Sequence, residues 1–256
     1  LRGRKKKQRF RNSKEVVFTA EGIVNNILHL KKGKAAGLQL DSLDIFIHLA
    51  QRCTYPTKST KKKQLKPFAS TLAAFFTYVA NADIPESIKA IFRATYLVAL
   101  EKDPDDFHKM RPLGIPAAIR RITANSIAHE LKPEFAKYLL PYNYAVGIHG
   151  GIDFITSTVR LGVEKYISSK ELSGDLPTRA LVSLDLRNMF NEISRHKLRE
   201  IVSEEFPQLI AFVDSLYKEP GSANVKLADG SWDCISVCEG FSQGCPLSPI
   251  LAAIVL

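Results

Sequence analysis

The sequence has little cysteine and no long apolar run, and each shortage excludes a class of protein. Four cysteines in 256 residues are too few for a disulfide-stapled scaffold, and no secretory signal peptide is recognisable. No apolar run reaches the roughly 18 residues that a membrane-spanning helix needs. The sequence therefore predicts an intracellular protein from a reducing compartment, with no membrane partner.

The composition is that of a folded chain with a sizeable core. Apolar residues make up 45% of the sequence and charged residues 24%, which excludes a wholly disordered or fibrous protein. The chain starts at Leu1 rather than at a methionine, and its last seven residues are an apolar stretch without a turn or cap. We therefore expect it to be a fragment of a longer protein.

Positive charge is concentrated near the N-terminus. The net charge is +10, yet residues 1–66 carry 17 basic and 4 acidic side chains, whereas the remaining 190 residues carry 19 and 22. Seven of the first eleven residues are basic, among them Lys5, Lys6 and Lys7. Such clusters bind phosphate backbones by releasing counterions, which predicts nucleic-acid binding. A solvated tail and a nuclear-import signal are the alternatives.

Hydrophobic periodicity and turn residues predict an α+β fold. A lysine-rich stretch over 54–66 is the expected linker. Helices are expected over 13–30, 41–52, 67–80, 86–93, 117–131, 133–140, 151–168, 195–204, 207–217 and from 243 onward. Strands are expected over 95–100, 111–116 and 180–186, with a hairpin formed by 223–227 and 232–237.

Asp185 is a candidate metal ligand. It lies near the end of the apolar segment 180–186, which reads as a buried strand. A buried carboxylate needs a partner, and Mg²⁺ prefers carboxylate oxygens together with phosphates and water. A helix N-cap or a salt-bridged aspartate is the alternative for this residue taken alone.

A glycine- and proline-rich loop and a set of basic residues are the other candidate features. The loop runs from Gly240 to Pro249, and its Gln243 offers both a donor and an acceptor near backbone that glycine leaves accessible. A turn that caps a core helix is the alternative. Basic side chains suited to phosphate contacts, or to the surface alone, are Lys102, Lys109, Arg111, Arg120 and Arg121.

Zinc is a minor alternative for the cysteines. Cys234, Cys238 and Cys245 could supply three ligands, but their spacing fits a strand pair better, and no histidine lies close to them in the sequence.

In combination, these motifs resemble a reverse transcriptase domain. The order is Lys102, then Arg111-Pro-Leu-Gly-Ile-Pro116 and Arg120-Arg121, then Val182-Ser-Leu-Asp-Leu-Arg-Asn-Met-Phe-Asn191, then Gly240-Phe-Ser-Gln-Gly-Cys-Pro-Leu-Ser-Pro249. Reverse transcriptases of non-LTR retrotransposons are most similar, with group II intron enzymes as relatives. The resemblance covers about 68–256 and implies an RNA-directed DNA polymerase.

The resemblance assigns roles to individual residues. Asp185 would be the first of three metal-binding aspartates, with the Leu186 carbonyl oxygen as a further ligand. Phe190 matches the aromatic residue that excludes a ribose 2′-hydroxyl. The nucleotide would be held by Lys102 (with Lys109 as a rival), Arg111, Gln243 and Gly244, and the template strand by Arg120 and Arg121.

The implied fold is that of a right-hand polymerase. Residues 67–256 would form the fingers and part of the palm, without a thumb, after a basic extension over 1–66. The implied partners are an RNA template, a nucleic-acid primer, deoxynucleoside triphosphates and, in the complete enzyme, two Mg²⁺ ions. Nuclear location is implied as well.

The chain departs from the family at its second metal-binding motif. The paired aspartates of the next palm strand are absent, and the adjacent Asp105 and Asp106 lie in the fingers segment, where they cannot replace them. Because one carboxylate cannot hold two metal ions, we expect this chain alone to lack polymerase activity. The alternative function is that of a decayed or repurposed, non-catalytic nucleic-acid-binding protein.

Overall fold

The computed structural model describes residues 15–38, 42–55, 65–81, 84–101, 105, 110–173 and 181–256, without the side chains of 169–173. It shows a mixed α/β protein with a four-stranded mixed sheet, which agrees with the expected fold class at this level. The chain divides into two compact units. Unit 1 comprises Leu1–Glu130 and Phe190–Leu256, and unit 2 comprises Leu131–Met189.

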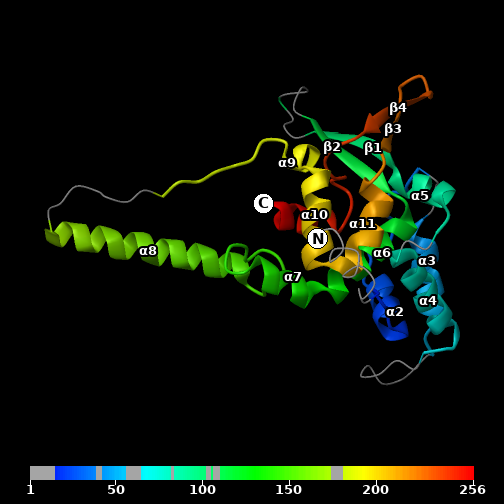
Figure 1. Ribbon diagram of the computed structural model, residues 1–256, viewed down its shortest axis with the longest axis horizontal. Helices are drawn as coiled ribbons and strands as arrows, with labels where there is room; N and C mark the ends of the chain where they lie inside the picture. The colour runs from blue at the N-terminus through cyan, green and yellow to red at the C-terminus, as the bar shows by residue number, and fades with distance from the viewer. Residues whose placement is uncertain are drawn as a thin grey trace, which may run out of the picture. The chain divides into compact units, whose positions relative to one another are not determined.

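The sheet belongs to unit 1 and has the strand order β2-β1-β3-β4 (Figure 1). Strand β1 pairs with β2 in antiparallel and with β3 in parallel orientation, and β3 pairs with β4 as an antiparallel hairpin. The predicted hairpin and the predicted strands over 95–100 and 111–116 are confirmed. The strand bounds are Ala94–Glu101 for β1, Met110–Pro116 for β2, Gly221–Lys226 for β3 and Trp232–Val237 for β4.

Helices supply most of the core of unit 1. Most of the predicted helices are confirmed to within a few residues. Fully buried side chains from several of them form the core, including Ile27, Phe76, Ile122, Leu198 and Phe212. The helix bounds are Ala20–Leu28 (α2), Leu43–Arg52 (α3), Phe68–Ala80 (α4), Glu86–Arg93 (α5), Ala118–Glu130 (α6), Arg195–Glu205 (α10), Ile210–Tyr217 (α11) and Ser248–Val255 (α12), with a 3₁₀ turn at Pro207–Leu209.

Helix α2 begins later than predicted. Residues 15–19 are not helical, and the Thr19 hydroxyl accepts a hydrogen bond from Gly22 N, which caps the helix. The preceding segment is held against α4 instead, because Asn81 bonds both Val16 N and Val16 O at 3.1 and 3.0 Å. Apolar residues ahead of the cap therefore pack as extended chain, which periodicity alone does not distinguish from a helical turn.

Unit 2 contains the helices α7 (Lys132–Leu139) and α8 (Gly151–Ser173). Both predicted helices are confirmed. Gly151 allows a close approach of the Tyr144 carbonyl group, because a Cβ at this position would overlap it. On α8 the large apolar side chains of Ile152, Phe154 and Leu161 are more than half exposed.

The prediction of a buried strand over 180–186 is wrong for the part that is described. Residues 181–186 have no regular secondary structure and are all exposed, with Leu184 at 85%. An apolar, β-branched composition is only a local preference, and a strand needs a neighbour that satisfies its backbone groups. In the described sheet both edges of β1 are occupied by β2 and β3, and this segment pairs with no strand.

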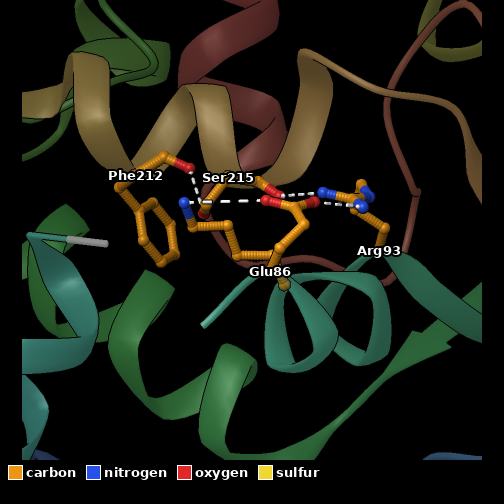
Figure 2. Close-up of polar contacts among 5 residues, drawn as sticks. Glu86, Arg93, Phe212 and Ser215 are labelled. Atoms are coloured by element: carbon orange, nitrogen blue, oxygen red, sulfur yellow. Dashed lines mark hydrogen bonds and ion pairs between the residues drawn. The ribbon is translucent and has the colours of Figure 1, made fainter. Parts of the chain in front are cut away.

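A polar network joins α5 to α11 in unit 1. Figure 2 shows the Glu86 carboxylate facing the Arg93 guanidinium. Arg93 Nη2 donates a hydrogen bond of 2.7 Å to Glu86 Oε1. Arg93 Nη1 also donates to the Ser215 carbonyl oxygen at 3.5 Å, and the Ser215 hydroxyl donates to Phe212 O. The network therefore anchors the helix that leads into β1.

This network makes stability depend on pH. The hydrogen bond from Arg93 lowers the pKa of Glu86 from its ordinary value of 4.5. The carboxylate therefore stabilises the fold above about pH 4.5, and this contribution is lost as the pH falls through the lowered pKa.

We expect Glu86→Gln to lower the urea midpoint slightly at pH 7, with a difference from wild type that disappears near pH 3. Urea unfolding followed by circular dichroism at both pH values measures it. Glu219→Gln is the control, because Glu219 is also exposed and lines a pocket together with Glu86 and Arg93. An equal effect of Glu86→Gln at both pH values would contradict this account.

Candidate functional site

Strand β2 carries the first group of candidate residues. Arg111 pairs with Leu100 of β1 near one end of the strand, and its side chain is exposed. The strand becomes buried toward Gly114 and Pro116. Lys102 and Lys109, the two candidates for the lysine role, lie outside the described residues, as do Lys5, Lys6 and Lys7.

The loop that carries Gln243 lies directly on β2. The Ser242 hydroxyl donates to the Gly114 carbonyl oxygen at 2.8 Å. A Cβ at Gly244 would overlap that same carbonyl oxygen, so glycine is required for the close approach. The structure therefore joins two motifs that are far apart in the sequence, the Arg111–Pro116 strand and the Gln243–Gly244 pair.

The same loop is bonded to the turn that carries Phe190. Phe190 is half-buried on the short helix α9 (Met189–Glu192), and its carbonyl oxygen accepts a hydrogen bond from Phe241 N at 2.6 Å. Gly240 N donates to Ile193 O at 3.1 Å. Gly240 has a positive φ of 67°, and a Cβ there would overlap the Asn191 backbone. The loop that carries Gln243 is thus hydrogen-bonded to the segment that carries Phe190.

Arg120 and Arg121 follow each other on α6 but face different surroundings. Arg120 is buried, with 2% of its surface exposed, and its Nη1 donates to Phe92 O at 2.8 Å. Arg121 is half-buried and donates to Ala35 O at 3.0 Å. The two guanidinium groups therefore do not form one continuous basic surface.

A cavity of about 370 Å³ lies over one face of the sheet in unit 1. Thr95 of β1, Ala223 of β3 and Ile235 of β4 are direct neighbours in the sheet register and line its floor. Its other walls bring together residues from several segments, among them Pro112, Gly114, Arg120, Asn191, Arg195, Tyr217, Phe241 and Gln243. Of the candidate residues, Arg120 and Gln243 therefore line this cavity, whereas Arg111, Arg121, Phe190 and Gly244 lie outside its lining.

Arg195 is a lining residue that the sequence analysis missed. Its Nε donates to Gly240 O at 2.8 Å and its Nη1 to Val237 O at 2.9 Å, and its guanidinium lies 5.3 Å from the centre of the Tyr217 ring. Burial lowers the pKa of Arg195 and raises the pKa of the Tyr217 phenol. A signal was present, because Arg195 shares the spacing of the buried Leu198 and Val202 on α10.

Asp185 and Leu186, the candidate metal ligands, belong to unit 2. Both are exposed and lie in the segment without regular structure. Within the described ranges no group of three or more histidine, cysteine, aspartate or glutamate side chains could hold a metal ion. The described residues therefore do not fit a two-magnesium site, and they do not support a zinc site at the cysteines, which are free.

No model of a known protein family matches the chain. No helix in the described part is long and apolar enough to cross a membrane.

Proposed function

We propose that this chain supplies the fingers and part of the palm of a retroelement reverse transcriptase, an RNA-directed DNA polymerase. The observation that carries the proposal is the convergence of three motifs in unit 1. The loop of Gln243 and Gly244 is bonded to β2 on one side and to the Phe190 turn on the other. By sequence resemblance, these segments contact the incoming nucleotide. They are far apart in the sequence, so no local pattern predicts that they lie together.

The chemistry of these residues supports the same proposal. Gln243 has an amide that donates and accepts hydrogen bonds, as recognition of a base pair or a sugar requires. Arg111 is exposed at one end of β2 and offers a guanidinium suited to bidentate phosphate contact. An aromatic side chain at Phe190 is bulky enough to reject a ribose 2′-hydroxyl by steric overlap.

The proposed reaction needs two metal ions, and the described residues do not form a site for them. Asp185 is the single carboxylate that the resemblance assigns to them, and two-metal transfer needs further acidic ligands. The proposal therefore places catalysis in a longer parent protein that contributes those ligands. It assigns to this chain the contacts with template and nucleotide.

Primer extension tests the proposal directly. The longer parent protein, given an RNA template, an annealed primer, deoxynucleotides and Mg²⁺, is expected to extend the primer, and the 256-residue chain alone is not. A parent that binds RNA in a salt-dependent manner but neither extends primers nor binds deoxynucleotides would instead be the non-catalytic binding protein. Extension by the 256-residue chain alone would overturn the assignment of catalysis to the longer protein.

We expect Phe190→Val in the parent to relax the choice between deoxyribonucleotides and ribonucleotides. The smaller side chain leaves room for a 2′-hydroxyl, and a steric pocket discriminates a single hydroxyl by about 10- to 100-fold. The ratio of kcat/KM for a deoxynucleotide to that for its ribonucleotide should fall by about this factor. This ratio does not depend on the amount of folded enzyme.

The matched control is Phe154→Val, because Phe154 is an exposed aromatic residue of α8 outside the candidate site. Its ratio should equal that of the wild type. An unchanged ratio in Phe190→Val would remove Phe190 from the nucleotide site.

A further inference from the structure

The cavity over the sheet contains two buried arginines. Arg120 comes from α6 and Arg195 from α10, and they are only 2% and 7% exposed. Arginine is rarely buried to this degree unless its charge is paired. The two guanidinium groups are therefore expected to have a negatively charged partner.

No carboxylate in the described part forms an ion pair with either guanidinium. Glu239 is the acidic residue that lines the cavity, but it is exposed, and its Oε2 accepts a 3.4 Å hydrogen bond from the Arg195 backbone N–H. A third lining arginine, Arg93, is already paired with Glu86. Burial is the main cause of the lowered pKa of Arg195; the charge of Glu239 opposes this shift, and the like charge of Arg120 adds to it. The cavity thus has an excess of positive charge.

An unsatisfied polar atom occurs in the same region. Arg120 Nε is buried without a hydrogen-bond partner among the described residues, and Arg120 lines the cavity. An unpaired buried donor costs about 1–3 kcal/mol, so such groups are usually met by water or a ligand. Neutral water would satisfy the donor but would leave the two positive charges unbalanced.

We propose that this cavity is an anion site, in which a free phosphate ion binds between the guanidinium groups of Arg120 and Arg195. Phosphate oxygens accept several charge-assisted hydrogen bonds at once, which suits the fixed donor geometry of arginine. Both arginines are nearly inaccessible from the surface, which favours a small ion over the backbone of a strand. This site does not depend on the proposed polymerase function.

Phosphate binding by the purified 256-residue chain tests the proposal. Isothermal titration with inorganic phosphate, at an ionic strength held constant with chloride, should give one saturable site. Arg195→Gln and Arg120→Gln should each raise Kd by about tenfold or more, as the loss of a charged hydrogen bond predicts. No saturable site in the wild type, or equal binding by wild type and both variants, would show that phosphate meets only the basic N-terminal region and would overturn the proposal.

Two further variants guard against misfolding. Arg199→Gln is the matched control on α10, because Arg199 is bonded to Asp214 at 2.6 Å and does not line the cavity. It should bind phosphate as the wild type does. Ala223→Leu keeps both arginines but fills the cavity floor, so it should abolish binding while circular dichroism shows a folded chain. Undiminished binding by a folded Ala223→Leu protein would place the phosphate elsewhere.

Competition with RNA separates the two sources of phosphate. A saturating single-stranded RNA oligonucleotide should leave the phosphate Kd unchanged if the ion binds at the buried arginines and the strand binds elsewhere. Displacement of phosphate by the RNA in the wild type would assign both arginines to a strand-binding surface and would overturn a free-ion site.

Discussion

Replacing Gly240 with alanine is expected to destabilise the protein far more than the same change at Gly230. Both glycines have a positive φ, 67° and 86°, so both substitutions place alanine in a left-handed conformation that costs about 1–2 kcal/mol. They differ in their surroundings. A Cβ at Gly240 would overlap the Asn191 backbone, whereas one at Gly230 would meet nothing within 4 Å.

We therefore expect Gly240→Ala to lower the free energy of unfolding by about 4 kcal/mol, near the upper end of single-residue effects, and Gly230→Ala by about 1 kcal/mol. Urea unfolding of both variants, followed by circular dichroism, gives the comparison. Because the backbone conformation is matched, the difference isolates the contact with Asn191. Equal losses for the two variants would show that the loop does not lie against α9 as described.

The reason for this sensitivity lies in the bonding of the loop. Gly240 N and Phe241 N hold it to Ile193 and Phe190, and Ser242 holds it to β2. Moving the loop by the width of a methyl group strains all three connections. A variant that remains folded should therefore also displace Gln243 relative to β2, so this glycine couples the stability of unit 1 to the geometry of the candidate site.

Local patterns predicted most of the elements of this fold. Helix α5 follows from Pro85 ahead of an amphipathic segment, and the β3–β4 hairpin from two β-prone segments around Asp229 and Gly230. Such elements depend on interactions between residues close in sequence. The pairing of β1 with β3 in parallel orientation is a contact between distant segments, and no local pattern specified it.

The failures have a common physical cause, which is that burial depends on tertiary partners. Segment 181–186 has the composition of a buried strand, yet the described sheet gives it no neighbour. Arginine is a residue type of the protein surface, yet Arg120 on α6 and Arg195 on α10 are buried. In both cases the residue type predicted an environment that the arrangement of the other elements overrode.

The candidate site shows the same division. Sequence resemblance singled out Gln243, Gly244 and Phe190, and the structure reveals the hydrogen bonds that connect their segments to one another. The sequence resemblance did not identify Arg195. An arginine at the start of a helix stands out only when the buried face of that helix is considered. Asp185 remains a prediction, since it belongs to unit 2 and the described residues do not assemble a metal site around it.

If the proposed function is right, Asp185→Asn is expected to abolish primer extension by the proposed longer parent protein without destabilising it. The amide is isosteric with the carboxylate but uncharged, and Mg²⁺ strongly prefers charged oxygen ligands. Loss of several kcal/mol of transition-state stabilisation corresponds to a fall of about a thousandfold or more in kcat. Because Asp185 is exposed, the free energy of unfolding should change by less than about 0.5 kcal/mol.

The matched control is Asp105→Asn. Asp105 is also exposed, and it belongs to the adjacent acidic pair that could be mistaken for a metal site. Its substitution should leave both primer extension and the urea midpoint close to wild type. A thousandfold loss in Asp185→Asn alone, with equal stability of the two variants, would support a catalytic role for the carboxylate. Equal activity of both variants would remove Asp185 from the active site and favour the non-catalytic nucleic-acid-binding function.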